Sequence, residues 1–473
     1  MIELSLFRTG HMLLQACPIE FSSYDVFIAG SGPAAAMLSA RLSSGGKRCL
    51  VVETGGLDVE DRIQSEHCVM EGSGHFDGAH WPAHWIRTLG GTSSVWGGWC
   101  TPLLERNFRG WPISRADLQP YYMDAARFLR RNVDFLDYGE PYLSGFDYRP
   151  FSDVWATRFG FAEDFPDYWE DERISVLLKH CVTRLLPEPD RRGIAGFSLY
   201  SVESDQFHEV PLLGHQKLVL AAGGMGNVQI LLGSQTGEGP AVGNEHDQLG
   251  RGLQEHPHFR AGRLVISTGN PLPYWPRHFG LSRPALVPSD ALFDAVGPID
   301  VSIGLEPANA DDQDEIERFV IGRIPGGATV YDMLLRTEMA YDPENRVTRS
   351  WGRTPSDLPR LSARCVIGQD VFHTVIEYMN RLGRVLIETD AGRLRLDSDV
   401  VHREFGGGGH TMGTTRMAAS PQSGVVDGDC RVHGYRNLFV AGSSVFPTAG
   451  YAHPTFTILA LSSRLADKIL EEG

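Results

Sequence analysis

A glycine-rich turn near the N-terminus is followed, about 20 residues later, by a glutamate at the end of an apolar run. The turn lies in YDVFIAGSGPAAAMLSARL (24–42), where an apolar run passes through Gly30 and Gly32 into a segment with helical character. Gly30 permits a tight turn, Gly32 lets the backbone approach a pyrophosphate, and Ala35 is small enough for helix-on-strand contact. The run RCLVVETGG brings Glu53 within reach of ribose hydroxyls, so the pattern predicts a dinucleotide site. A carboxylate here would repel a 2′-phosphate, which disfavours NADP.

Two histidines in the C-terminal part of the chain are the other candidates for chemistry. His453 stands between an alanine and a proline, after the run NLFVAG, and His410 follows the four glycines 406–409. A neutral imidazole has a pKa near neutral pH, so it can take a proton from a weak acid. The chain has 17 histidines, so residue type alone assigns no role. Three others are interpreted as core or cap residues: His180, His256 and His433.

Two further apolar runs end like the first and must help to position these residues. KLVLAAGG (217–224) and NLFVAGSS (437–444) are both broken by Ala-Gly and both precede segments with helical character. We therefore predict an α/β fold whose discontinuous, Rossmann-like nucleotide-binding sheet is assembled from segments scattered along the chain. The predicted nucleotide-binding domain comprises residues 20–260 and 405–473, with residues 261–404 inserted as a second domain.

Length and composition narrow the class of protein. With 473 residues the chain is too long for one compact core, which agrees with two domains. The formal net charge of −16 disfavours nucleic acid as a partner. It would attract a cationic substrate, although a solvated acidic surface explains it as well. The seven cysteines are scattered without a metal-like cluster, which suits a reducing compartment and predicts no metal site.

The N-terminus, MIELSLFRTGHMLLQACPIEF, contains no apolar run long enough for a secretory signal. LLQAC faintly resembles a lipoprotein cleavage box, but the apolar core that should precede it is missing. No stretch of the chain approaches the length of apolar sequence that a transmembrane helix needs. We therefore expect a cytoplasmic protein with no membrane partner.

A series of segments, in order along nearly the whole chain, resembles the glucose–methanol–choline (GMC) oxidoreductase family of FAD enzymes. They are YDVFIAGSGPAA with Glu53, LGGTSSVWGGWCTP (89–102), GWPISRADLQPYY (110–122), LVLAAGGMGNVQILL (218–232), LGRGLQEHP (249–257), HTMGTTRMA (410–418) and GVVDGDCRVHGYRNLFVAGSSVFPTAGYAHPTFTI (424–458). The last two are the most specific, and this end looks most like the pyranose oxidase and sugar dehydrogenase branch. The resemblance implies an FAD-binding domain packed against an α+β substrate domain that contains an antiparallel sheet.

The resemblance also assigns residues to the cofactor through their positions in the shared motifs. It places Gly30, Gly32 and Ala34 at the FAD pyrophosphate and Glu53 at the ribose. The loop along the pyrophosphate and isoalloxazine would contain Gly91, Ser94, Trp96, Gly97 and Trp99. Adenine would be contacted by Val182, Ala222 and Gly223. The ribityl chain would be contacted by Gly442, and the flavin ring by His453 and Thr455.

One position departs from the branch in a way that bears on the cofactor. Members of the pyranose oxidase branch often attach FAD covalently through a histidine, and the corresponding residue here is Val95. Because valine has no nucleophile, we predict non-covalent FAD.

The same motifs give roles to the two histidines. His410 is expected to be the general base that takes the hydroxyl proton of an alcohol as a hydride passes to flavin N5. His453 would orient the hydroxyl and stabilise the developing alkoxide, and the reverse assignment stays open. The four glycines 406–409 are interpreted as flexible backbone that lets His410 approach the flavin.

The predicted activity is FAD-dependent oxidation of a CH–OH group of a sugar, glycoside, amino sugar, cyclitol or related polyol to the carbonyl. Oxygen or another acceptor would take the electrons from the reduced flavin. The acidic net charge makes an amino sugar a side prediction. One alternative is a non-redox flavoprotein, like the hydroxynitrile lyases of the same family, and another is a binding module without catalysis.

Overall fold

The computed structural model of the chain describes residues 13–14, 19–133, 136–153, 171–235, 237–273, 282–309, 314–324, 326–397 and 405–472. The expectation of no secretory signal and no lipoprotein box depends on the first 18 residues, most of which lie outside the described residues. Among the described helices, none combines the length and the apolar character needed to cross a membrane.

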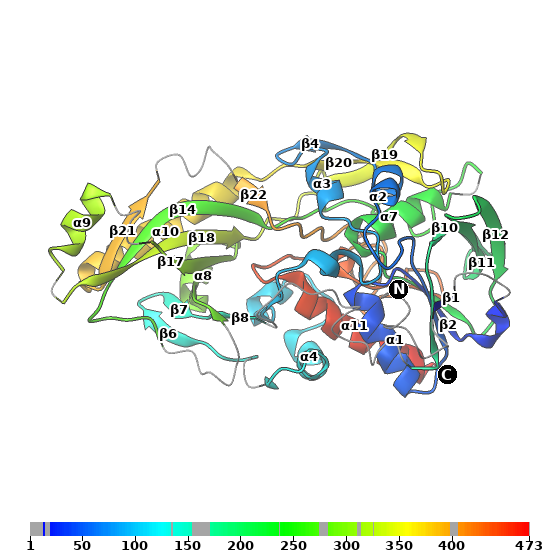
Figure 1. Ribbon diagram of the computed structural model, residues 1–473, viewed down its shortest axis with the longest axis horizontal. Coiled ribbons are helices and arrows are strands. Elements are labelled where there is room, and N and C mark those ends of the chain that lie inside the picture. The colour runs from blue at the N-terminus through cyan, green and yellow to red at the C-terminus, as the bar shows by residue number, and fades with distance from the viewer. Residues whose placement is uncertain are drawn as a thin grey trace, which may run out of the picture.

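A parallel sheet of six strands forms the centre of one half of the molecule (Figure 1). Its strands, in spatial order, are β1 (Leu13–Leu14), β9 (Ile174–Leu177), β3 (Cys49–Val52), β2 (Val26–Ala29), β13 (Lys217–Leu220) and β23 (Leu438–Val440). Every residue of β2, β3, β9 and β23 is buried, as short apolar strands covered on both faces require. The predicted strands, far apart in sequence, are therefore neighbours, which confirms the predicted α/β fold.

The first and the last long helices lie side by side next to this sheet (Figure 1, blue and red). α1 (Pro33–Ser44) packs against α11 (Pro454–Glu471), and α11 also packs against α4 (Arg115–Phe128). Small side chains permit the close approach, because the buried residues include Ala34–Ala36 on α1 and Ala460 on α11. This packing brings the glycine turn before α1 and the histidine before α11 into one region.

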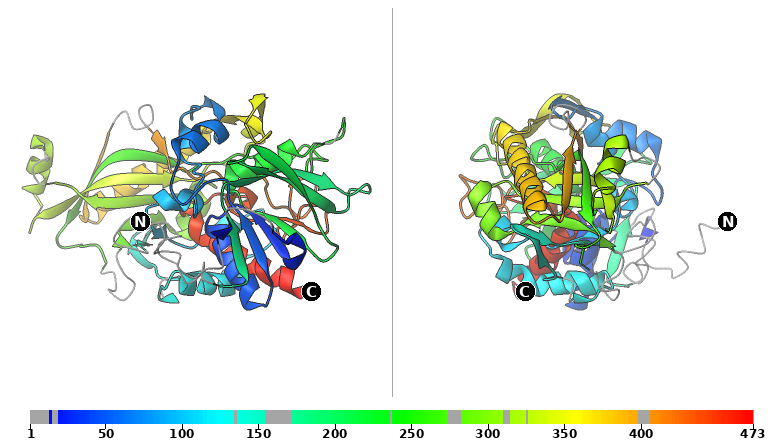
Figure 2. Two further views of the ribbon diagram at one scale, coloured as in Figure 1. Left: turned by 45° about the vertical axis from the view of Figure 1, so that its right-hand side comes forward. Right: turned by 90° about the vertical axis from the view of Figure 1, so that its left-hand side faces the viewer.

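An antiparallel sheet of eight strands supports the other half of the molecule (Figures 1 and 2). Its strands, in spatial order, are β21 (Gly392–Leu396), β14 (Pro257–Ser267), β18 (Ala328–Thr337), β17 (Val301–Pro307), β16 (Ala285–Pro288), β7 (Phe146–Tyr148) and β6 (Glu140–Leu143), while β22 (Phe405–Gly407) pairs with β14. The amphipathic helix α10 (Gln369–Glu388) packs against β21 through a buried stripe that includes Val375, Tyr378 and Leu382. This is the antiparallel sheet that the resemblance implied.

The predicted domain boundaries at 260/261 and 404/405 stay a prediction. The antiparallel sheet takes most of its strands from residues 261–404, and it also takes β6 and β7 from earlier in the chain. β14 and β22 each extend across or beyond a predicted boundary, and they pair with one another. The first residues of the C-terminal segment are thus paired with the last residues before the inserted one.

Smaller elements complete the molecule. The small sheets are β10 (His180–Pro187) with β11 (Ile194–Ser201) and β12 (Gln206–Pro211), β15 (Ser282–Arg283) with β8 (Phe151–Asp153) and β5 (Trp99–Cys100), and β19 (Arg346–Arg353) with β20 (Pro359–Cys365) and β4 (Met70–Gly74). The remaining helices in the described part of the chain are α2 (Asp61–His67), α3 (His80–Ala83), α7 (Gly223–Gly233), α8 (Asp290–Val296) and α9 (Glu315–Ile321). Its 3₁₀ turns are η1 (Phe21–Ser23), η2 (Gly91–Val95), η3 (Glu105–Phe108) and η7 (Ser443–Val445).

Candidate active site

A cavity of about 560 Å³ lies where the carboxyl ends of the parallel strands meet the antiparallel sheet. Its walls include the segments that directly follow β2, β3, β13 and β23. In open α/β sheets this crevice is where ligands bind. The opposite wall contains residues of the antiparallel sheet, among them His258 and Arg336.

The two glycines of the first turn line one end of the cavity for different reasons. Gly30 has a φ of +102°, and a Cβ there would lie 2.5 Å from the carbonyl oxygen of Ala221, so the turn itself requires glycine. Gly32 has an ordinary φ of −69°, and a Cβ there would come no closer than 3.8 Å to a described chain atom. Gly32 thus leaves space at the N-terminus of α1, where Ala34 also lines the cavity.

Glu53 lies at the same end, 5% exposed, with both carboxylate oxygens already bound. Its Oε2 accepts hydrogen bonds from Ser31 Oγ at 2.7 Å and Ser31 N at 3.1 Å, and its Oε1 accepts one from Gly55 N at 2.9 Å. Burial raises the pKa of Glu53, and these hydrogen bonds together with the Arg87 charge oppose that rise. The network fixes the carboxylate at the edge of the cavity.

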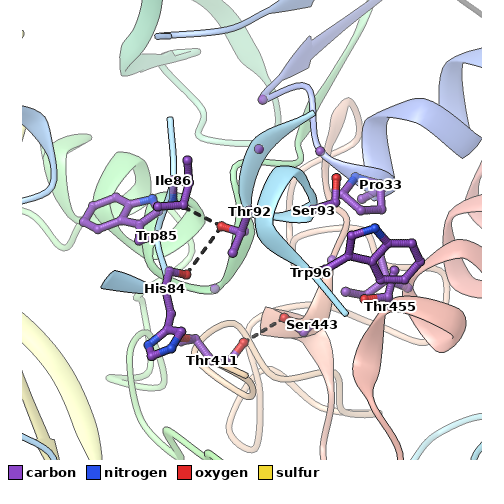
Figure 3. A pocket seen from close by; sticks show the side chains of 18 of the residues that line it. Pro33, His84, Trp85, Ile86, Thr92, Ser93, Trp96, Thr411, Ser443 and Thr455 are labelled. Carbon is purple, nitrogen blue, oxygen red and sulfur yellow. Dashed lines mark hydrogen bonds between the residues drawn. The ribbon is translucent and has the colours of Figure 1, made fainter. Parts of the chain in front are cut away.

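The loop 89–102 follows the cavity wall (Figure 3). Gly91, Trp96, Gly97 and Trp99, four of its five predicted cofactor residues, line the cavity. Ser94 does not: its Oγ is buried without a hydrogen-bond partner in the described residues.

The local conformation of η2 explains this difference. The 3₁₀ turn directs the neighbours of Ser94 to the cavity, where Ser93 Oγ donates to the carbonyl of Gly90 at 2.5 Å. Thr92 Oγ1 accepts a hydrogen bond from Ile86 N at 3.1 Å, as Figure 3 shows, and so ties the turn to the loop that follows α3. The other predicted cofactor residues also line the cavity: Val182, Ala222, Gly223, Gly442, His453 and Thr455.

His410 and His453 meet at the opposite end of the cavity. Their ring centroids are 5.3 Å apart and the rings are nearly perpendicular. His453 is the N-cap residue of α11, directly before Pro454, and its ring packs edge-on against Phe151 at 5.2 Å. Ser443 Oγ donates a hydrogen bond to the carbonyl of Thr411 at 2.7 Å (Figure 3). This bond links the segment that follows His410 to the segment that leads to His453.

The carboxylate of Glu255, buried two residues before β14 begins, holds His410 in place. It accepts hydrogen bonds from the backbone N–H of His410 at 2.8 and 3.0 Å and pairs with His80 Nε2 at 2.9 Å. The neighbouring Gln254 connects the two histidine segments, because it bridges to Met412 and accepts from Ala449 N at 3.1 Å. The segment LGRGLQEHP therefore positions both histidines.

His256 determines which nitrogen of His410 carries a proton. The carbonyl oxygen of Ala449 lies 3.4 Å from His256 Nε2 and can only accept, so His256 Nε2 is the donor. His256 Nδ1 is then an acceptor, and at 3.0 Å it receives the N–H of His410 Nδ1. The hydrogen-bond network therefore leaves the lone pair of a neutral His410 at Nε2.

The imidazoles of this end are held neutral. Burial is the largest cause that keeps the pKa of His410 well below its ordinary value, followed by the neighbouring His256 and His453. Burial and then Arg336 lower the pKa of His453 in the same way. Groups this close titrate as a set, so the depressed pKa belongs to the site.

Sequence interpretation missed several residues of this end. His256 was expected to be a core residue, and it is indeed 0% exposed, but it is hydrogen-bonded to His410. His258, Arg336 and Glu255 were given no role. The available signal was the EHPH run, because alternate residues of a strand share one face and His256 and His258 therefore point the same way.

The glycines before His410 are closely packed. A Cβ at Gly407 would lie 2.4 Å from the His80 ring, one at Gly408 would lie 2.6 Å from His410 Nδ1, and one at Gly409 would lie 2.2 Å from the His84 ring. The run was interpreted as flexible backbone, but imidazole rings pack directly on it. Although several histidines converge here, no group of His, Cys, Asp or Glu among the described residues is arranged to hold a metal ion.

Comparison with known proteins adds the family. Residues 338–462 match the model of the GMC oxidoreductase family. The fructose dehydrogenase large subunit of Gluconobacter japonicus is 23% identical over 63% of this chain and 54% of its own length. Paromamine 6′-oxidase of Streptomyces fradiae is 27% identical over 54% of this chain and 45% of its own length. This chain thus spans about half the length of these curated relatives.

A solved structure agrees with the fold of nearly the whole chain. Pyridoxine 4-oxidase from Mesorbium loti superimposes with a TM-score of 0.56 at 18% identity, covering 94% of this chain and 99% of that one. The family match covers both His410 and His453, and the shared fold includes the sheet that forms the cavity. This chain therefore contains the C-terminal domain of the GMC oxidoreductase family, at residues 338–462.

Proposed function

We propose that this chain is an FAD-dependent oxidoreductase that converts a CH–OH group of a sugar, glycoside, cyclitol or related polyol to the carbonyl. The pair His410 and His453, in contact at one end of a cavity that begins at the glycine turn, is the observation that carries the proposal. The names of the curated relatives, a fructose dehydrogenase and a paromamine 6′-oxidase, support a sugar-like substrate.

The glycine-turn end of the cavity fits FAD. The space beside Gly32 is not needed by any described part of the chain, and a Cβ there would occupy it. The first backbone N–H groups of α1 have no partner within the helix and would face the pyrophosphate. Glu53 would meet the ribose. Val95, 55% exposed, lines the cavity and offers no nucleophile, so the cofactor would be held without a covalent bond.

When bound, FAD would supply the acceptor for the hydride of the carbinol carbon. His410 Nε2 takes the hydroxyl proton, because its lone pair is free and the low pKa keeps it unprotonated. His256 accepts the N–H of His410 Nδ1 and so keeps the basic nitrogen directed away from itself. Glu255 fixes the backbone of His410, which limits the movement of the imidazole.

His453 would orient the substrate hydroxyl. Its Nδ1 is buried without a partner in the described residues, so a ligand is the group left to satisfy it. It also stands at the N-terminus of α11, whose partial positive charge favours a developing alkoxide. The opposite assignment, with His453 as the base, makes less use of the His256 hydrogen bond.

Anaerobic mixing with alcohols tests the proposal. Purified protein supplied with FAD is mixed, without oxygen, with a panel of sugars, glycosides and cyclitols, and the loss of visible flavin absorbance is recorded. Bleaching by at least one polyol is the expected result, and a flavin that stays oxidised with every member of the panel would overturn it. Admitting air and assaying peroxide then separates an oxidase from a dehydrogenase.

Two controls sharpen this test. Acid precipitation should release all flavin into the supernatant, and flavin that stays with the precipitated protein would contradict non-covalent binding. A non-redox flavoprotein of the hydroxynitrile-lyase kind would bind FAD yet never bleach with any alcohol, since acid–base chemistry alone leaves the flavin oxidised.

A further inference from the structure

Arg336 is a buried cation at the histidine end of the cavity. It lies on β18, is 4% exposed, and lines the cavity. Its guanidinium makes no hydrogen bond or ion pair with a described residue, and its buried Nε has no partner there. Its contact is with the face of Phe151, 5.5 Å from the ring centroid. Buried arginines are almost always paired, because removing an unpaired cation from water is costly.

The neighbouring charges leave this cation uncompensated. The negative charge of Glu306 acts to raise the pKa of Arg336, but the Glu306 carboxylate is paired with Arg283 at 3.3 Å. Arg283 itself lines the cavity and lies over the ring of Trp99 at 4.3 Å. Burial first, and then Arg283, lowers the pKa of Arg336 to about 10, so its guanidinium is still charged at neutral pH.

Two further unsatisfied groups point to the same place. His258 stands directly opposite Arg336 in the antiparallel sheet, and its buried Nε2 has no partner among the described residues. His453 Nδ1 is the second such atom. Arg336 and His453 both pack against Phe151, so the cation lies one aromatic ring away from the proposed reacting hydroxyl.

We propose that the substrate is an alcohol that also carries an anionic group, a carboxylate or a phosphate, and that this group binds Arg336. The inference rests on the proposed function and narrows its substrate class to the acidic members. A guanidinium presents a planar fork that matches either anion with two hydrogen bonds. His258 Nε2 can donate a third.

The same charges disfavour a cationic substrate. The net charge of −16 made an amino sugar a side prediction, but that charge belongs to the whole chain. A ligand responds to the local field, and the histidine end of the cavity carries Arg336 and Arg283 beside neutral imidazoles.

Matched pairs of substrates test this directly on the holoenzyme. Glucose is compared with glucuronate, and glycerol with glycerate and with glycerol 3-phosphate, by the rate of anaerobic flavin reduction. The acidic member should exceed its neutral partner in kcat/KM by about 10²-fold or more, the effect expected when a buried charge gains its partner. The carboxylate and phosphate arms distinguish the two anions. Equal rates for neutral and acidic partners would overturn the inference.

Variants locate the effect. Arg336→Met should lower kcat/KM for the acidic substrate by about 10²–10³-fold, mainly through KM, while the neutral substrate is little affected. Arg336→Lys should recover part of the loss, since it keeps the charge and loses the fork. Arg381→Met is the matched control, because Arg381 is half exposed on α10 and paired with Glu377. An equal loss for neutral and acidic substrates would assign Arg336 to the cofactor or to the fold.

Anion binding without turnover provides an independent measurement. At constant ionic strength, acetate or inorganic phosphate should raise the Tm of the wild-type holoenzyme and of Arg381→Met relative to chloride. The Tm of Arg336→Met should rise less than that of the wild type, or not at all. A panel in which no alcohol bleaches the flavin would refute the proposed activity, while this anion-dependent shift would still decide the fate of the Arg336 site. If neither anion raises the Tm of the wild-type holoenzyme, the proposed anion site at Arg336 is overturned.

Discussion

The two ends of the cavity differ in how their buried polar groups are satisfied. At the glycine-turn end, both oxygens of Glu53 are bound by Ser31 and Gly55. At the histidine end, His453 Nδ1, His258 Nε2 and Arg336 Nε are buried without partners in the described residues. The Glu53 carboxylate is thus satisfied within the chain, whereas the second end has side chains whose polar atoms await a ligand.

This difference separates two kinds of binding site. A site formed by backbone N–H groups and one carboxylate can hold a permanently bound cofactor, because its shape is fixed by the turn and by the ends of the strands. A cluster of unpaired donors with depressed pKa values suits a transient ligand, whose arrival satisfies them. Substitutions at the first end should therefore affect cofactor binding and stability, and those at the second end should affect turnover.

The largest effect is expected from His410→Ala. The variant should keep its FAD spectrum and lose about 10²–10⁴-fold in the rate of anaerobic flavin reduction, because the proposed general base is gone. Rapid-mixing absorbance measures it, with Tm as the control for folding. If His453→Ala loses more than His410→Ala, the two roles are exchanged.

A pair of glycine variants tests the proposed cofactor site at the glycine turn. Gly30→Ala should lower the free energy of unfolding by about 2–4 kcal/mol even without FAD, since it combines a positive φ with a clash against Ala221. Gly32→Ala should leave the stability of the cofactor-free protein unchanged and weaken FAD binding. Chemical denaturation and FAD titration separate the two. A Gly32→Ala variant that binds FAD normally would contradict the assignment of this space to the pyrophosphate.

A smaller effect is expected from Glu53→Ala. It would leave the Ser31 and Gly55 donors unsatisfied, at a cost of about 1–3 kcal/mol in the free energy of unfolding, and would weaken FAD binding. Glu53→Gln keeps one acceptor oxygen and should lose less. Denaturant titration of the three proteins checks the order, and a Gln variant weaker than the Ala variant would count against this network.

The smallest effect is a displacement of the pH profile. The base must be unprotonated, and its pKa is depressed, so kcat/KM should stay at its plateau as pH falls past 6.5 and decline only below that. Arg336 contributes to the depression, so Arg336→Met should move the acid limb upward toward 6.5. Steady-state rates across pH with a neutral substrate measure this displacement. An acid limb at the same pH in Arg336→Met and the wild type would show that Arg336 does not influence the pKa of His410.

Much of the fold was readable from local patterns. The strand and turn before Gly32, the spacing to Glu53 and the two later Ala-Gly strands predicted one parallel sheet, and β2, β3, β13 and β23 are adjacent in it. Those signals are local, because a buried parallel strand is a short apolar run and a phosphate turn needs glycine. The sequence did not predict which side chains of the loop 89–102 line the cavity. Ser94 shows the reason, because adjacent side chains of a 3₁₀ turn point in different directions.

The sequence alone determined the glycine-turn end of the cavity. A glycine turn, an acidic residue and the start of a helix act over a few bonds, so their effect does not depend on distant parts of the chain. Only the tertiary structure decided the chemistry of the other end. His256 directly precedes β14, His258 lies on β14 and Arg336 lies on β18. Their meeting with His410 depends on strand register and on the pairing of β22 with β14. A shift of one residue in that register would turn each side chain to the opposite face, so local patterns indicated His410 and His453 but not the residues that surround them.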